Sequence, residues 1–148
     1  MDLLRTGLAL VLASAIGTTG CAQICPRTGS VGSVPSAADP PERTVAVYLA
    51  AINARDGDTM DELSTPAYAE HGEAVRCDWT VSHAKITGVG PDRDLQGRFW
   101  EVVQVGVLFE LSQRDETPEM PSGETGLSYW LGRNGPADRW LIYDSGHG

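Results

Sequence analysis

The amino-acid sequence predicts an α+β domain in which two to three N-terminal helices pack on one face of a curved antiparallel sheet of about four strands. Apolar residues recur at helical spacing in the segment that follows Pro40. After Arg76 they alternate as they do in strands, and turns rich in Pro, Gly and Asp separate the later apolar runs. Helices followed by strands are typical of the α+β class, and one domain is expected over residues 41–148.

The first helix is expected over residues 41–57. Proline is favoured in the first turn of a helix, where Pro41 would lie, and Glu42 would lie at the positive end of the helix dipole. Gly57 would end the helix. One apolar stripe at helical spacing would face the sheet, and it consists of Val45, Tyr48, Leu49 and Ile52.

Two shorter helices are expected to follow the first one. Asp58 or Thr59 would cap the first of them. Thr65 and Pro66 form a cap and a first-turn proline for the second, which would extend to about Glu73.

The strands of the sheet are expected over residues 77–89, 98–113, 125–133 and 139–146, and the last two flank a hairpin-type turn, NGPAD. In the first strand, alternation places on one side Trp79, Val81, His83, Lys85 and Thr87. The second strand has an apolar face that only Glu101 interrupts, with Phe99, Val103, Val105, Val107, Phe109 and Leu111.

The first residues have the composition of an export signal, which we expect over residues 1–20. Arg5 precedes an uncharged segment whose strongly apolar part, residues 8–16, is about half of the roughly 20 residues that a membrane span requires. The small, turn-prone GTTG follows this apolar part. A positive start, a short apolar run and small residues before a cleavage site are typical of a secretory signal.

The residues TTGC at the end of this segment resemble a bacterial lipobox. The resemblance implies cleavage after Gly20 and lipidation of Cys21, which would anchor the chain to the outer face of the cytoplasmic membrane. Thr18 departs from the pattern, which usually has Leu, Val or Ile at that position. Residues 21–40 would then be the lipidated cysteine and a flexible tether. An ordinary secretory signal and an uncleaved anchor are the alternatives.

Charge and cysteine content restrict the partners. The formal net charge of −9 argues against nucleic acid and against electrostatic docking on anionic lipid. In an oxidising compartment, Cys25 and Cys77 could form a disulfide that closes a loop of roughly 50 residues and stabilises the fold by about 4 kcal/mol. Alternatively, Cys25 belongs to the flexible tether and Cys77 is a free, partly buried thiol.

The segment TVAVYLAAINARDGDTMDELSTPAYA, a helix that ends in a DGD turn before a short second helix, resembles the opening of the nuclear-transport-factor-two-like superfamily. The final RWLIYDSGHG is similar to the tryptophan-containing last strand of many small members of that superfamily. The resemblance covers residues 40–146 and implies a cystatin-like cone, in which the sheet wraps around the first helix. It supports the fold far more than any activity.

Some members of the superfamily are isomerase-like or cyclase-like enzymes that use the cone as a pocket. The resemblance therefore implies candidate catalytic residues here: Glu101 or His83 as a base, with Tyr48 and Tyr68 near the mouth of the cone. The alternative is that Glu101 lies where the strand reaches solvent and that His83 pairs across the sheet. No metal or cofactor is expected, because His71, His83 and His147 lack the spacing of a ligand set and no phosphate-binding loop is present.

The tryptophans are the remaining candidates for a binding site. Trp79, Trp100, Trp130 and Trp140 all fall on predicted strands, where they would fill the core, line a pocket for an apolar ligand, or mark a partner surface. We expect a lipid-anchored, non-catalytic domain that binds a small apolar ligand or an envelope protein. The alternatives are a small enzyme and a structural or immunity-type interaction domain.

Overall fold

The computed structural model describes residues 26–70, 79–94, 96–116, 118 and 120–147. Within these residues, helices precede an antiparallel sheet of strand order β1-β2-β3-β4, which confirms the predicted α+β class and element order. The helices are α1 (Pro41–Ala54), α2 (Gly57–Glu62) and α3 (Pro66–Glu70). The strands are β1 (Thr80–Pro91), β2 (Glu101–Ser112), β3 (Gly123–Arg133) and β4 (Leu141–Gly146).

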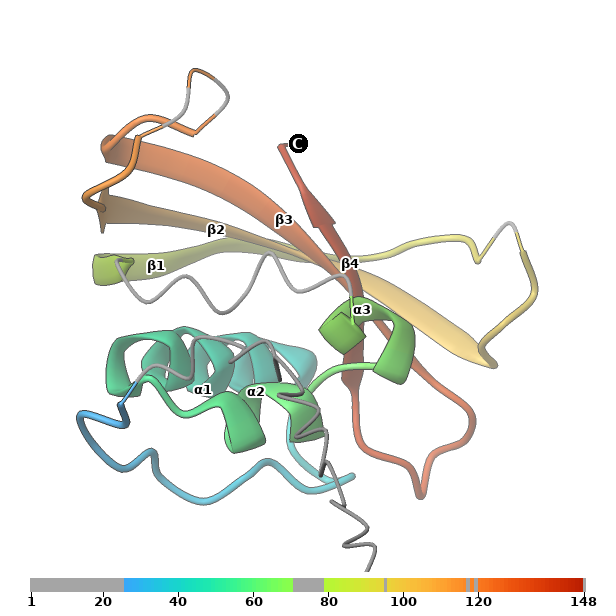
Figure 1. The fold of residues 1–148 in the computed structure, drawn as a ribbon. Coiled ribbons are helices and arrows are strands. Elements are labelled where there is room, and N and C mark those ends of the chain that lie inside the picture. The colour runs from blue at the N-terminus through green and yellow to red at the C-terminus, as the bar shows by residue number, and fades with distance from the viewer. Residues whose placement is uncertain (1–25, 71–78, 95, 117, 119, 148) are drawn as a thin grey trace, which may run out of the picture.

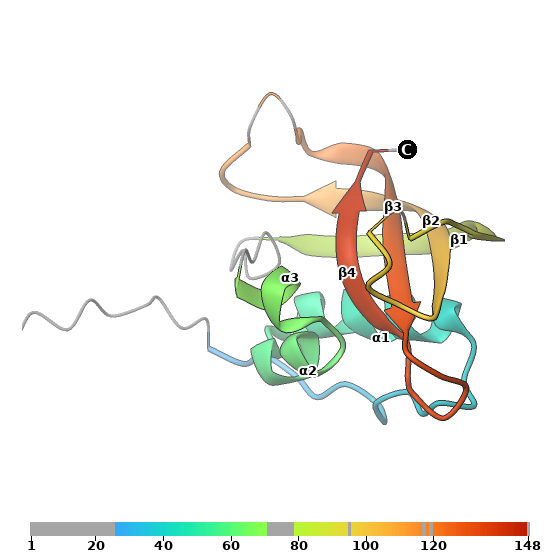
Figure 2. The ribbon, with the colours of Figure 1, turned by 90° about the vertical axis from the view of Figure 1, so that its right-hand side faces the viewer.

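The helices cover one face of a curved sheet (Figures 1 and 2). Helix α1 contacts β1, β2 and β4, and α3 contacts β4. The predicted stripe of α1 is buried, and so is the predicted apolar face of β2 from Val103 to Leu111. These two faces therefore form the core between the helical layer and the sheet.

The end of α1 differs from the prediction. The helix ends at Ala54, because Arg55 adopts the left-handed conformation, with φ 56°. Asp56, rather than Asp58 or Thr59, caps α2, and its side chain accepts a hydrogen bond of 3.2 Å from the Thr59 backbone N–H. Gly57 thus begins the second helix.

Strand β1 does not alternate as expected. Its pairing with β2 shifts register between Ser82 and Lys85 and again between Ile86 and Gly88. His83 has a φ of 54°, a left-handed conformation that a regular strand excludes. Consequently Val81 and Ile86 face the core, whereas His83, Lys85 and Thr87 are exposed.

The two edges of the sheet are held differently. On the β4 edge, the Ile142 N–H donates to the Leu63 carbonyl and the Ile142 carbonyl accepts from the Thr65 N–H, at 2.9 and 2.8 Å. On the β1 edge, the Asn53 amide makes two 2.7 Å hydrogen bonds with the backbone of Val81. Beyond Val81, the β1 edge carries the two register shifts and Lys85 and ends in a proline.

The segment expected to be a flexible tether packs on the domain where it is described, from residue 26 to residue 40. The Thr28 N–H donates to the Ala54 carbonyl at 2.8 Å and the Thr28 hydroxyl to the Asn53 carbonyl at 3.0 Å. These two carbonyls belong to the last turn of α1 and have no partner within the helix, so the segment caps α1. Farther along, Val31 and Val34 pack against the core.

No helix within the described ranges is long and apolar enough to cross a membrane. The predicted signal peptide, Cys21, Cys25 and Cys77 all lie outside the described residues, as does His71.

Candidate functional site

At one end of the sheet, an exposed and a buried tryptophan lie beside a pair of opposite charges. We call Trp100, Glu101, Arg133 and Trp140 the Trp100 cluster. Strand β2 begins at Glu101 directly opposite Arg133, the last residue of β3. The Trp100 N–H donates to the Arg133 carbonyl at 3.1 Å. The backbone of the sheet thus fixes the position at which the Trp100 side chain leaves the domain.

The Arg133 side chain connects a buried indole to an exposed one. Its guanidinium carbon lies 4.3 Å from the centre of the Trp140 ring and 6.0 Å from that of Trp100. The same guanidinium donates to Glu101 Oε2 at 2.8 Å through Nε and at 2.6 Å through a terminal nitrogen. Trp140 is 4% exposed and Trp100 is 64% exposed. The Arg133 guanidinium, which stacks on Trp140 and is hydrogen-bonded to Glu101, therefore lies between the buried indole and the exposed one.

The loop between β1 and β2 folds back over the outer face of the sheet and contacts β3 and β4 beside the Trp100 cluster. The Phe99 ring lies 5.0 Å from the Tyr143 ring and rests against Gly132, where a Cβ would come within 2.4 Å of it. At the start of the loop, Asp92 accepts a 2.7 Å hydrogen bond from Trp130 Nε1. The loop that carries Trp100 is therefore attached to the sheet at both of its ends.

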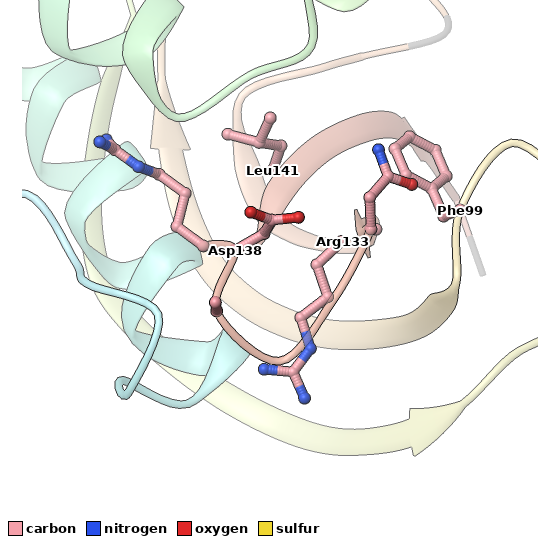
Figure 3. Close-up of a pocket in the computed structure, with 8 residues that line it drawn as sticks. Phe99, Arg133, Asp138 and Leu141 are labelled. Carbon is pink, nitrogen blue, oxygen red and sulfur yellow. The ribbon is translucent and has the colours of Figure 1, made fainter.

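A shallow hollow of about 300 Å³ lies beside the cluster, and Arg133 belongs to both (Figure 3). The hollow is lined by Phe99, Gly132, Arg133, Asn134, Ala137, Asp138, Arg139 and Leu141. In Figure 3 the Asp138 carboxylate and Leu141 lie on one side and Phe99 on the other. The lining is mixed: Arg133, Asn134, Asp138 and Arg139 are charged or polar, and Phe99, Ala137 and Leu141 are apolar.

The structure brings the two candidate tyrosines together. The Tyr48 ring lies 6.4 Å from the Tyr68 ring and 5.9 Å from that of Tyr129 on β3. The Tyr68 hydroxyl lies 2.8 Å from Ser145 Oγ. Burial raises the pKa of Tyr48 well above its usual value, and Tyr68 and Tyr129 raise it further. Tyr48 is therefore a neutral core residue at physiological pH.

Glu101 and His83 do not join these tyrosines. Tyr129 lies opposite Val105, four residues from Glu101 and so roughly 13 Å away along the strand. Glu101 is engaged by Arg133, while His83 projects from the irregular β1 edge and is exposed. The four residues that the family resemblance implies therefore do not form one site in the structure.

The four tryptophans differ in location. Trp79 and Trp140 belong to the core and directly precede β1 and β4, so the prediction that all four lie on strands is wrong. Trp130 lies on β3 and is partly buried. Trp100, just before β2, is the most exposed large apolar side chain in the described part of the chain.

The sequence did not indicate the contacts of Arg133 or the position of Asp138. Arg133 lies next to the hairpin turn and Asp138 within it, where charged residues ordinarily face solvent, and Glu101 precedes its partner Arg133 by 32 residues. A signal was present in Phe99 and Trp100, two adjacent aromatic residues after a turn. Across the described ranges, no group of three or more His, Cys, Asp or Glu residues is placed to hold a metal ion.

No protein-family model matches the chain. No curated protein matches it either. Among solved structures, the α+β fold is similar to that of a SEC-C motif containing protein from Rhodopseudomonas palustris, determined in solution. The TM-score is 0.55 over 77% of this chain and 82% of that one, with 13% sequence identity. At this identity, the similarity concerns the fold alone.

Proposed function

We propose that the protein is a lipid-anchored extracytoplasmic domain, of the cone-shaped nuclear-transport-factor-two-like type, that binds an envelope protein through the Trp100 cluster and the adjacent hollow. The exposed Trp100 carries this proposal. A soluble domain gains stability by burying an indole, and here the loop and Arg133 hold the ring in solvent instead. Exposed tryptophans with arginine neighbours are typical centres of protein interfaces.

The core supports a protein partner over a ligand inside the cone. Helix α1 packs on β1, β2 and β4, its Tyr48 ring lies against Tyr129 of β3, and Val45, Tyr48 and Leu49 are each at most 4% exposed. The separation of Glu101 and His83 from the tyrosines argues in the same direction against the isomerase-like or cyclase-like alternative.

Replacing Trp100 by Ala should weaken partner binding by about 30-fold or more, because truncation of an interface tryptophan typically costs 2 kcal/mol or more. Membranes from cells that produce each variant would be treated with a crosslinker, and adducts of discrete mass would be quantified. Val89→Ala is the matched control, since Val89 is also exposed but lies on β1. Equal adduct yields from the two variants would contradict a role of Trp100 in binding.

The anchor is proposed from TTGC and from a short uncharged leader. Intact mass spectrometry of the membrane-extracted protein should show a chain that begins at Cys21 with added acyl mass. Cys21→Ala should abolish this mass, because the substitution removes the acceptor thiol. An unacylated wild-type chain would refute the anchor.

The same spectra, recorded with and without reductant, test the bridge between Cys25 and Cys77. Arg27 follows Cys25 by two residues and forms an ion pair with Asp56, while Trp79 follows Cys77 by two residues and its carbonyl accepts from Arg55. Neighbours of both cysteines thus bond to consecutive residues, which supports the proposed disulfide. We expect a gain of two hydrogen masses on reduction, and no gain would mean free thiols.

A further inference from the structure

The chain joins the domain through a small set of contacts that we call the clamp: Arg27 and Thr28 on one side, and Asn53, Ala54 and Asp56 on the other. Arg27 forms an ion pair with Asp56, and Thr28 makes the two hydrogen bonds to the end of α1. The adjacent Gly29 lies so close to the helix end that a Cβ would come within 3.6 Å of that of Ala54.

The clamp includes a buried side chain of the domain, that of Asp56. The Asp56 side chain is 2% exposed, and besides Arg27 it accepts from the Thr59 backbone N–H and from the Thr59 hydroxyl, at 3.2 and 2.9 Å. The hydrogen bond from Arg27 is the main reason that the pKa of Asp56 is lowered. Arg27 supplies a positive partner to this buried carboxylate, which offsets part of the cost of removing its charge from water.

The clamp leaves a short connection to the lipidation site. Between Cys21 and Arg27 there are five residues, whose fully extended chain spans roughly 20 Å. A free tether from Cys21 to Pro40 would reach about three times as far. The clamped end of the domain therefore remains close to any anchor carried by Cys21.

The Trp100 cluster lies at the other end of the sheet. The clamp adjoins the start of β1, because Asn53 bonds to Val81, and Thr80 pairs with Ser112 at the end of β2. Trp100 precedes the start of β2, a strand of 12 residues that spans roughly 36 Å. In Figure 1 the chain enters beside α1 at one end of the sheet, and the β1–β2 loop and the β3–β4 turn lie at the other.

We propose that the clamp holds the domain over the membrane with its α1 C-terminal end toward the lipid and the Trp100 cluster directed away from it, toward an envelope protein. This inference rests on the proposed lipid anchor. It assigns Arg27, Thr28 and Asp56 an orienting role, and it separates Trp100 from the lipid surface. The acidic net charge of −9 further disfavours contact of the domain's sides with anionic lipid.

Energy transfer to labelled lipid tests the orientation. A dye would be attached through a bioorthogonal amino acid at position 100 or at position 112, where Ser112 is exposed. Lipidated protein in phosphatidylcholine vesicles that contain an acceptor lipid should transfer energy severalfold more efficiently from position 112 than from position 100. Equal transfer, or stronger transfer from position 100, would overturn the proposal.

Variants that remove clamp contacts provide a second test of the orientation. In Arg27→Ala/Asp56→Ala, measured under reductant so that no Cys25–Cys77 bridge holds the chain, the difference between the two dye positions should shrink, because the connection loses the ion pair that fixes it to the domain. Asp61→Asn is the matched control: it removes an exposed carboxylate from the same short helix and should leave the difference intact. A double variant that retained the full difference would refute the orienting role of the clamp.

A lipid-independent measurement distinguishes failure of the clamp from failure of the anchor. In the Cys21→Ala protein, which lacks the acceptor thiol, the Thr28 amide should exchange with deuterium slowly, because it donates to the Ala54 carbonyl. Rapid exchange would overturn the clamp whatever the lipid. Slow exchange together with a wild-type chain that carries no acyl group would instead refute the anchor, and with it the orientation at a membrane.

Discussion

Replacing Trp140 by Ala should lower the free energy of unfolding by about 3–5 kcal/mol. The indole is 4% exposed and belongs to the core, so truncation leaves a large void that neighbouring strands fill only in part. The change also removes the surface on which the Arg133 guanidinium stacks. Urea denaturation, followed by the midpoint and the slope of the transition, would measure the loss.

The matched control for this change is Trp100→Ala, which removes the same side chain from the exposed position of the same cluster. We expect this variant to remain within about 0.5 kcal/mol of the wild type, as is usual for exposed positions. If both variants lost similar stability, Trp100 would be a core residue and the proposed binding surface would have to be abandoned.

Replacing Asp56 by Ala should cost about 2–3 kcal/mol, because the change removes a helix cap and a buried acceptor of hydrogen bonds from a charged group. Asp56→Asn is the matched variant. Asparagine caps helices about as well as aspartate but lacks the charge that Arg27 requires, so its cost should be about 1 kcal/mol. Thermal unfolding at neutral pH would rank the variants, and equal stability of Asp56→Ala and the wild type would contradict the cap.

The contribution of the Asp56 charge should depend on pH in one direction. Arg27 lowers the pKa of Asp56 below its usual value in the folded state. The resulting stability is complete above the pKa of the unfolded chain, about 3.9, and is lost as the pH falls through the lower folded value. The stability difference between the wild type and Asp56→Asn should therefore narrow on acidification from pH 6 to about pH 3, a range chosen to bracket that pKa. If the stability difference between the wild type and Asp56→Asn stayed constant over this range, the Asp56 charge would add no stability.

The regular parts of the fold could be predicted because local patterns report burial directly. The stripe of α1 and the face of β2 from Val103 to Leu111 follow from spacing, and both are buried. Phe99, predicted for the same face, instead lies before β2 and packs on Gly132. The alternation predicted for β1 is wrong, because each register shift changes which face of the sheet the following side chains occupy. The local sequence pattern does not indicate where such a shift occurs. The same holds for His83, whose left-handed backbone only the pairing with β2 reveals.

Long-range pairs explain most of what the sequence did not indicate. The segment from 26 to 40 has the composition of a tether, yet its Arg27 forms an ion pair with Asp56, which lies 29 residues later in the chain. Alternation alone could not decide which tryptophan is exposed, because that depends on how the β1–β2 loop folds over Gly132. Composition describes what a segment tends to do alone, and the clamp and the Trp100 cluster exist only after the chain has folded.

The irregular β1 edge has a consequence for a protein confined to a surface. Lipid anchoring would hold many copies in one plane, so that encounters between neighbours become far more frequent than in dilute solution. An open strand edge is a template for pairing with another copy. Here one edge is bridged at Ile142 by residues 63–65, and the other is interrupted by bulges, a lysine and a proline. These features would keep a dense layer of the domains from polymerising sheet to sheet.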